Sequence, residues 1–129
     1  MEKFKTLLIE DNLIYRGVLK HALMEHFENI DTREASDEFD ALETLDTYIP
    51  DLVIVDIHLK TGANGLELTR QIKLDHPEVV VAILSQHDIP EYRAVALQNG
   101  AEYFLSKSTS LENIFDFVES ILIRKNYSH

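Results

Sequence analysis

Cysteine is absent from this chain of 129 residues, and glycine and proline are scarce, with four and three residues. The absence of cysteine excludes disulfides, thiolate zinc sites and thiol nucleophiles. Scarce glycine and proline exclude a collagen-like chain. No apolar run approaches the roughly 20 residues that span a bilayer, and the N-terminus lacks a long apolar signal core. We therefore expect a cytoplasmic protein with no membrane contact.

Positive charge is also in short supply. Twelve basic side chains accompany 23 acidic ones, for a formal net charge of −11. An acidic surface disfavours binding to phosphate backbones, so we expect no direct contact with nucleic acid and consider proteins, metals or small molecules as partners. With 45% hydrophobic and 27% charged residues, the composition is that of an ordinary globular protein. We expect residues 1–129 to form a single domain.

Short apolar runs alternate along the chain with helix-like spacing of apolar residues. The runs predict strands at residues 5–9, 30–35, 52–55, 79–84 and 103–105. The spacing predicts helices over residues 14–27, 37–45, 66–76, 90–99 and 111–122. Among the helix positions, Ile14, Val18 and Phe39 are expected to face the core. Ser36 is the expected N-cap of the second helix, and Asn99-Gly100 is the expected C-cap of the fourth.

Five strand-helix units joined by right-handed crossovers predict a doubly wound α/β fold, with a five-stranded parallel sheet and helices on both faces. The runs at 52–55 and 79–84 are uniformly apolar, which is typical of buried central strands. The alternating segment 30–35 and the short segment 103–105 suit the edges of the sheet. This pattern agrees with the flavodoxin-like strand order 2-1-3-4-5, although it does not prove that order.

Polar side chains gather where four of these strands end. The first strand is followed by Glu10 and Asp11, the third by Asp56, the fourth by Ser85 and the fifth by Ser106-Lys107. Open α/β sheets bind ligands at this edge. Taken singly, such residues are more often turn residues, helix caps or solvated charges. Together, three carboxylates repel one another unless a cation lies among them, so the sequence predicts a Mg²⁺ site built for phosphoryl chemistry.

The segments that carry these residues resemble the receiver domain of bacterial response regulators, the phosphoacceptor module of two-component signalling. The resemblance covers essentially the whole chain. It rests on residues 7–12, 50–56, 64–68, 82–85 and 100–107. It implies a module that accepts a phosphoryl group from a histidine kinase or a phosphotransfer protein. Such a module is no enzyme beyond catalysing its own phosphorylation and slow dephosphorylation.

The resemblance assigns Asp56 as the phosphoacceptor. It implies that Glu10, Asp11 and Asp56 hold Mg²⁺ together with the backbone carbonyl of His58. The chemistry of these groups agrees with that assignment, because a carboxylate can attack the phosphorus of a phosphohistidine. The metal then neutralises phosphoryl oxygens, and Lys107 pairs with another of them.

The resemblance also implies a switch. Ser85 takes a Ser/Thr position whose hydroxyl bonds the new phosphoryl group, and Phe104 takes the aromatic switch position. Phosphorylation adds roughly two negative charges, so the hydroxyl and its loop should move inward. Phe104 has no hydroxyl, so packing must drive its rotation, and its alternative role is that of a plain core residue. The implied output surface comprises the last two helices and the strand between them, and activation is expected to promote a homodimer.

Three departures from the family pattern bear on the site. Ser108 stands where the family commonly has proline after Lys107, and a cis bond without proline would cost about 2.5–4 kcal/mol. Residues 57–64 form a loop that lacks the usual Met-Pro and is one residue longer than usual. Gln86 stands where the family has a small residue, so it can screen the phosphoryl group. The departures leave the conformations of the loop and of the Lys107-Ser108 peptide open and remove no site residue.

The six histidines show no pair at the spacing of metal ligands on a helix. Four are expected at the surface, namely His21, His26, His76 and His129. His58 and His87 flank the phosphosite, two residues after Asp56 and Ser85. With Gln86 they are candidates for setting the lifetime of the phosphoryl group, by excluding water or by positioning it, and we favour exclusion. The alternative is that they are solvated loop residues.

Two other function classes use similar parts. A hydrolase of the haloacid dehalogenase type also combines a nucleophilic Asp, Ser/Thr, Lys and Mg²⁺. Its nucleophile lies in an Asp-x-Asp motif, whereas Asp56-Ile57-His58 follows the third strand and lacks the second Asp. A flavodoxin-like cofactor carrier needs a phosphate-cradling loop after the first strand, which this sequence lacks. Both classes are therefore disfavoured.

Ser108 and the segment 88–93 resemble the NarL/FixJ subgroup of response regulators. Receivers of this subgroup usually precede a helix-turn-helix DNA-binding domain. The chain is therefore expected to be either such a receiver without its output domain or a free-standing one.

Overall fold

The computed structural model describes residues 2–59, 62, 64–86, 89–125 and 127. Its strands are β1 (Phe4–Ile9), β2 (Ile30–Ala35), β3 (Leu52–Asp56), β4 (Val80–Ser85) and β5 (Tyr103–Ser106). Its helices are α1 (Leu13–His26), α2 (Glu38–Leu45), α3 (Gly65–Asp75), α4 (Pro90–Gln98) and α5 (Leu111–Arg124). None of the helices in this described part is long and apolar enough to cross a membrane.

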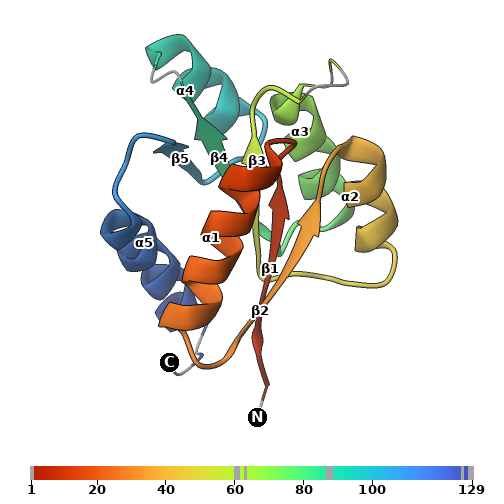
Figure 1. The fold of residues 1–129 in the computed structure, drawn as a ribbon. Coiled ribbons are helices and arrows are strands. Elements are labelled where there is room, and N and C mark those ends of the chain that lie inside the picture. Colours follow the sequence, from red (N-terminus) through yellow and green to blue (C-terminus); the bar gives the residue numbers. More distant parts are fainter. Residues whose placement is uncertain (1, 60–61, 63, 87–88, 126, 128–129) are drawn as a thin grey trace.

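The strands form one parallel sheet in the order β2-β1-β3-β4-β5. Figure 1 shows the sheet running through the middle of the molecule, with helices on both sides. All residues of β3 are buried at the centre, whereas β2 and β5 form the edges. The predicted doubly wound α/β fold with flavodoxin-like strand order is confirmed.

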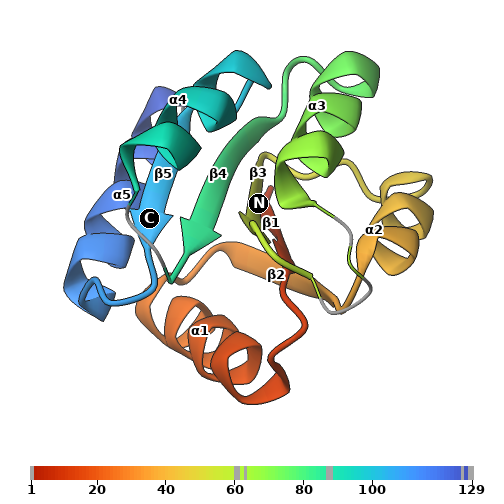
Figure 2. The same cartoon turned by 90° about the horizontal axis from the view of Figure 1, so that it is seen from above.

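Each face of the sheet carries its own hydrophobic core. On one face, α1 and α5 pack over side chains that include Ile54 and Leu84. On the other face, α2, α3 and α4 pack over side chains that include Val55 and Ile83 (Figure 2). Successive residues of a strand point to opposite faces, so the uniformly apolar β3 and β4 supply both cores. Burial on both faces fixes the strand ends, and with them the polar residues found there.

Side-chain caps set where four of the helices begin. The first turns of α1, α3 and α5 are capped by Asn12, Asn64 and Ser110. The prediction of Ser36 as the N-cap of α2 is wrong, because Asp37 takes that position and accepts a hydrogen bond from the Asp40 N–H at 2.8 Å. The Asp40 carboxylate in turn accepts from the Ser36 N–H at 3.1 Å. The cap therefore lies one residue later than predicted, and the Ser36 N–H is bonded by Asp40 instead.

The predicted end of α4 is confirmed. Asn99 is its C-cap, and the backbone N–H of Asn99 donates to carbonyls of the last turn. Gly100 follows with a φ of 97°, a backbone conformation that favours glycine. The chain can therefore turn sharply from α4 into β5.

Three apolar helix residues that were predicted to face the core are exposed instead: Ile14 at 80%, Val18 at 56% and Phe39 at 71%. In α1 the buried stripe runs through Leu19 and Leu23. In α2 it runs through Ala41 and Leu45. A three-to-four spacing defines a stripe on a helix, but not which side of that stripe meets the sheet. Ile14 is thus an exposed apolar side chain in the first turn of α1, close to the end of β1.

Candidate functional site

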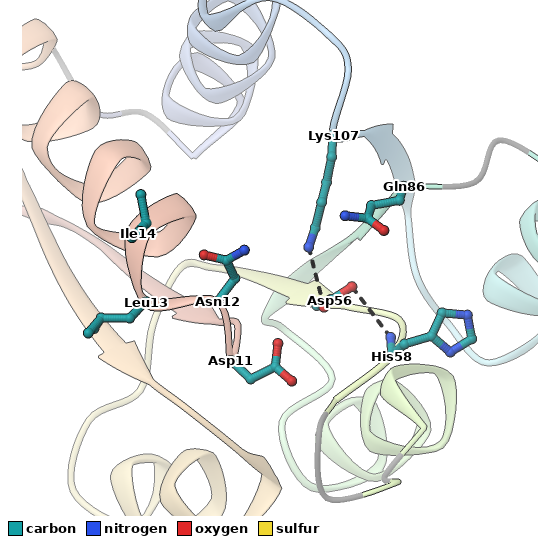
Figure 3. A pocket seen from close by; sticks show the side chains of 8 residues that line it. All are labelled: Asp11, Asn12, Leu13, Ile14, Asp56, His58, Gln86 and Lys107. Carbon is teal, nitrogen blue, oxygen red and sulfur yellow. Dashed lines mark hydrogen bonds and ion pairs between the residues drawn. The ribbon is translucent and has the colours of Figure 1, made fainter.

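The carboxyl ends of β1, β3 and β5 bring charged residues to one edge of the sheet. Glu10 and Asp11 directly follow β1, Asp56 is the last residue of β3, and Lys107 directly follows β5. Asp11, Asp56 and Lys107 line a common pocket of about 530 Å³ (Figure 3). The structure thus brings together the charged residues that the sequence places after these strands.

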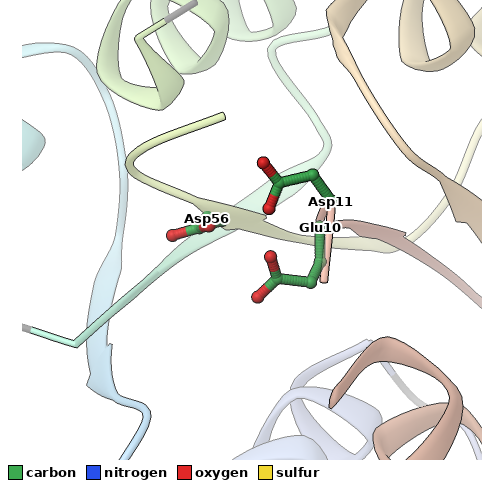
Figure 4. Close-up of side chains that lie close together, drawn as sticks. All are labelled: Glu10, Asp11 and Asp56. Carbon is green, nitrogen blue, oxygen red and sulfur yellow. The ribbon is translucent and has the colours of Figure 1, made fainter. Parts of the chain in front are cut away.

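Glu10, Asp11 and Asp56 form a compact acidic cluster (Figure 4). One carboxylate oxygen of each lies within 4.8 Å of those of the other two. Glu10 and Asp56 are only 4% and 6% exposed, and Asp11 is half-buried. Carboxylates held this close repel one another, and hard divalent cations take such oxygens as ligands. The cluster is therefore able to hold a metal ion.

Lys107 bridges two of these carboxylates. Its Nζ lies 2.5 Å from Oε1 of Glu10 and 3.4 Å from Oδ2 of Asp56. Burial lowers the pKa of Lys107, but the interactions with Glu10 and Asp56 outweigh burial, so that the pKa is raised. The ammonium group stays charged and offsets one of the three negative charges of the cluster.

Glu10 is the most buried carboxyl group of the cluster. Burial raises its pKa to about 7, although hydrogen bonds from Lys107 and from the Asn12 N–H act in the opposite direction. The negative charge of Asp56 raises the pKa as well. Oε2 accepts the Asn12 bond at 3.1 Å, whereas Oε1 has the Lys107 ion pair and no further hydrogen-bond partner within the described ranges. A cation at the cluster would supply the missing compensation.

A glycine fixes the backbone beside Asp56. The N–H of Gly65 donates to the Ile57 carbonyl at 2.8 Å. A Cβ on Gly65 would lie 2.1 Å from the carbonyl oxygen of Asp56, so only glycine fits there. Residues 60–61 and 63 of the loop that the sequence left open lie outside the described residues.

Ser85 and Phe104 lie on neighbouring strands. Ser85 is fully buried at the end of β4, and its carbonyl accepts the Lys107 N–H at 2.8 Å. Phe104 is half-buried on β5, and the guanidinium carbon of Arg93 on α4 lies 4.9 Å from its ring centroid. Their predicted roles in the switch stay predictions.

The peptide after Lys107 is trans, since the described residues contain no cis peptide bond. The Ser106 and Ser108 hydroxyls share a hydrogen bond of 2.7 Å, and the Ser106 hydroxyl also accepts from the Ser108 N–H at 3.2 Å. The Thr109 N–H donates to the Ser106 carbonyl at 3.1 Å. Hydroxyl side chains thus shape the turn where the family commonly has proline.

The three lifetime candidates differ in position. Gln86 is exposed and lines the pocket beside Lys107 (Figure 3). His58 contacts Asp56 through its backbone, whose N–H donates to Oδ1 at 3.4 Å. Its imidazole meets Tyr92 of α4 edge to face, with ring centroids 5.9 Å apart. His87 lies outside the described residues.

The other histidines within the described residues do not line this pocket. His21 and His26 are exposed and His76 is half-buried, while His129 lies outside the described residues. His26 also stacks on Phe115 at 4.0 Å between centroids, so it joins α1 to α5. For the three described histidines, the predicted surface positions hold for His21 and His26 and only partly for His76.

Two residues in the first turn of α1 support the site and were not singled out from the sequence. Arg16 donates to the Glu10 carbonyl at 2.6 Å and pairs with Glu34 at 3.0 Å. The Tyr15 ring centroid lies 5.1 Å from Nζ of Lys107. Their position just after the Glu10-Asp11 pair was an available signal, because that turn must begin at the same edge of the sheet.

Comparisons with known proteins agree with this site. A family model for the response regulator receiver domain matches residues 6–119. The chain is 28% identical to the transcriptional regulatory protein DegU of Brevibacillus brevis, over 98% of this chain and 53% of that protein. It is 33% identical to the transcriptional activator protein ExaE of Pseudomonas putida, over 94% of this chain and 56% of that protein. The chain thus spans about half the length of these curated relatives.

Solved structures show the same likeness. The signal receiver domain of NarL from Mycobacterium tuberculosis is 26% identical, with a TM-score of 0.83 over 93% of this chain and 96% of that chain. A LuxR-family two-component response regulator from Aurantimonas is 25% identical, with a TM-score of 0.85 over 95% of this chain and 86% of that chain. Relatives of the NarL and LuxR type agree with the subgroup expected from the sequence.

The family match, the strand order and the acidic cluster lead to one classification. The module accepts a phosphoryl group and is not a conventional enzyme, and its family implies a histidine kinase as partner. The chain belongs to the response regulator receiver domain family of two-component signalling.

Proposed function

We propose that Asp56 is the residue that accepts the phosphoryl group. The observation that carries this proposal is the convergence of Asp56 with Glu10, Asp11 and Lys107 at one edge of the sheet. Asp56 ends the central strand, so its backbone is fixed while its carboxylate lines the pocket. A carboxylate oxygen attacks the phosphorus of a phosphohistidine: a P–O bond forms, the P–N bond breaks, and the imidazole leaves and takes up a proton.

The neighbouring groups suit the transfer. Glu10, Asp11, Asp56 and the backbone carbonyl of His58 would hold Mg²⁺, which when bound neutralises phosphoryl oxygens. Lys107 already lies 3.4 Å from Asp56 and can pair with another oxygen of the transferred group. Ser85, at the end of the adjacent strand, would donate its hydroxyl to the same group.

The direct test is phosphorylation by acetyl phosphate with Mg²⁺, followed by intact mass. The wild-type protein should gain one phosphate, and Asp56→Asn should gain none. Asp51→Asn is the matched control, because Asp51 lies just before β3 at its opposite end. An Asp56→Asn protein that gains phosphate at the wild-type rate would overturn the assignment.

The phosphoryl donor is a histidine kinase or a phosphotransfer protein in this proposal. Leu13 and Ile14 line the pocket and are 69% and 80% exposed. Exposed apolar side chains beside a polar site suit a protein donor that covers them as it presents its histidine. Replacing both residues with serine should slow transfer from a phosphorylated kinase while leaving transfer from acetyl phosphate unchanged. Equal slowing with both donors would argue against docking at this position.

The signal leaves through α4, β5 and α5 in this proposal. Two ring contacts join α4 to the site: Tyr92 meets His58, and Arg93 covers Phe104. A shift of the loop after β3 or of Phe104 would therefore be felt by α4. Beryllofluoride with Mg²⁺ should shift backbone amide NMR signals around residues 86–108 and promote a homodimer measurable by light scattering. An unchanged spectrum in that region would exclude this output route.

Gln86 sets the lifetime of the phosphoryl group by excluding water in this proposal. It lines the pocket beside Asp56 and Lys107, whereas the His58 imidazole packs on Tyr92. Hydrolysis needs a water in line about 3 Å from phosphorus, so a side chain in that space slows it. Decay of the phosphorylated protein should be faster in Gln86→Ala than in His58→Ala or His87→Ala. Slower decay in Gln86→Ala would show that the amide positions the water.

The proposal treats residues 1–129 as one receiver domain. The curated relatives are named as transcriptional regulators, and the chain spans about half of their length. A DNA-binding segment outside residues 1–129 would carry such an output. Residues 1–129 by themselves should not bind DNA, because their net charge is −11. A mobility shift of DNA by this chain alone would contradict that expectation.

A further inference from the structure

Tyr15 presents an aromatic ring to the ammonium group of Lys107. It is the third residue of α1, and its N–H donates to Oδ1 of Asn12 at 3.0 Å. The ring is half-buried and packs against the core beneath α1 and α5. Nζ of Lys107 lies 5.1 Å from the ring centroid, within the roughly 6 Å over which cations are attracted to aromatic rings. The ring therefore offers a fixed contact to a flexible lysine.

We propose that Tyr15 is a positioning residue whose ring holds the Lys107 ammonium group in the pocket, ready to pair with a phosphoryl oxygen. The inference rests on the proposed role of Asp56. It gives the Tyr15 side chain of α1 a role in placing Lys107, which follows β5.

The other contacts of Lys107 change during phosphotransfer. Oδ2 of Asp56 lies 3.4 Å from Nζ, and Asp56 is the group that would receive the phosphoryl group. Oε1 of Glu10 lies 2.5 Å from Nζ, and Glu10 belongs to the cluster that can hold a metal. A lysine side chain has a flexible four-carbon stem and loses considerable conformational entropy when it is held in one geometry. The ring of Tyr15 takes no part in either exchange, so it can keep Nζ near Asp56 throughout.

The ring, rather than the hydroxyl, carries this role. Within the described ranges the Tyr15 hydroxyl makes no hydrogen bond. Burial raises the pKa of Tyr15, so the hydroxyl stays neutral at ordinary pH. Phenylalanine at position 15 should therefore keep the contact with Lys107. Leucine fills similar space but has no aromatic face, so it should lose that contact.

The first test is the rate of phosphorylation by acetyl phosphate with Mg²⁺. Tyr15→Leu should lower the maximal rate about threefold to tenfold, as expected for loss of one partly desolvated cation–aromatic contact, with little change in the half-saturating donor concentration. Tyr15→Phe should restore the rate to within about twofold of wild type. Tyr103→Leu is the matched control, because Tyr103 packs in the same core but against Phe117.

The second test is spectroscopic and does not depend on phosphorylation. An aromatic ring face shifts nearby protons upfield, so the Lys107 side-chain methylene next to Nζ should resonate upfield in the wild type and in Tyr15→Phe. That signal, assigned by its loss in Lys107→Arg, should move toward the free-lysine position in Tyr15→Leu and stay in place in Tyr103→Leu. The measurement reports the contact even if Asp56 is not the phosphoacceptor.

Three results would overturn the inference. One is a Lys107 signal that does not move in a folded Tyr15→Leu protein. Another is a Tyr15→Phe rate as low as that of Tyr15→Leu, which would assign the effect to the hydroxyl. The third is an unchanged phosphorylation rate in Tyr15→Leu while Asp56→Asn still abolishes phosphorylation, which would separate this failure from a failure of the proposed function.

Discussion

Two clusters of charged side chains lie at opposite ends of β5, and they are balanced in opposite ways. At the amino end, Glu102 pairs with Lys73 at 3.1 Å and with Arg124 at 2.9 Å. Burial raises the pKa of Glu102, but hydrogen bonds from the two cations outweigh it, and the pKa is lowered. One carboxylate therefore has two cations, an arrangement that needs no further ligand.

At the carboxyl end the ratio is reversed. Lys107 is shared by Glu10 and Asp56, and Asp11 lies beside them. Here burial prevails, and the pKa of Glu10 is raised to about 7. The two clusters therefore differ in their surplus charge: the two cations around Glu102 satisfy the first, whereas the second keeps a surplus of negative charge that a cation can offset.

The largest expected difference between the two clusters is in the phosphorylation rate after the lysine of each is replaced by methionine. Lys107→Met should lower the rate of phosphorylation by acetyl phosphate about a hundredfold, because it removes a preplaced charge from the transferred group. Lys73→Met is the matched control and should keep the rate within about twofold, since Lys73 lies beside Glu102 and not in the pocket. Equal losses in the two variants would mean that both clusters act only on stability.

The pH dependence of stability should differ in sign between the clusters. In metal-free protein, the pKa of Glu10 is raised from 4.5 to about 7, so the native state binds this proton more tightly than the unfolded chain does. Its contribution to the free energy of unfolding is therefore full below pH 4.5 and is lost as pH rises through about 7, by about 3 kcal/mol. The lowered pKa of Glu102 acts in the opposite direction, since its contribution is lost as pH falls.

Urea unfolding of wild type and Glu10→Gln in the presence of a chelator isolates the Glu10 contribution. Glutamine resembles the protonated carboxyl group, so the two proteins should be about equally stable near pH 4.5. The variant should become the more stable one as pH rises to 7 and above. A stability difference that stays constant over this range would show that Glu10 does not titrate with a raised pKa.

Mg²⁺ should sharpen the comparison by acting on one cluster alone. A ligand at ten times its Kd stabilises the native state by about 1.4 kcal/mol, which corresponds to a rise in Tm of about 5 °C for a domain of this size. The rise should vanish in Asp11→Asn and persist in Glu102→Gln. A rise of the same size in Asp11→Asn would mean that Mg²⁺ binds outside the acidic cluster.

The parts of the fold that depend on hydrophobic pattern could be predicted from the sequence. The uniformly apolar segments that became β3 and β4 had to be buried on both faces, and the alternating β2 had to lie at an edge. Parallel strands bring their carboxyl ends to one edge, so Asp56 and Lys107 had to lie near each other. A rule about strand direction was sufficient for this part of the site.

Other features depend on side-chain directions that a linear pattern does not contain. The exposure of Ile14 and Phe39 follows from the rotation of each helix against the sheet, which spacing alone leaves open. The N-cap of α2 is Asp37 rather than Ser36, because the Asp37 carboxylate accepts from the Asp40 N–H while the Asp40 carboxylate accepts from the Ser36 N–H. The contact between Tyr15 and Lys107 joins residues that are far apart in sequence, so only the folded chain reveals it.

The most direct measurement is to locate the acyl phosphate within the chain. After reaction with acetyl phosphate and Mg²⁺, borohydride reduces an aspartyl phosphate to homoserine and releases phosphate, and peptide mass spectrometry identifies the converted residue. The account predicts homoserine at position 56 and intact aspartate at positions 11 and 51. Conversion at Glu10 or Asp11 with Asp56 intact would contradict it, because the carboxylates thought to surround the phosphoacceptor would then be the acceptors themselves.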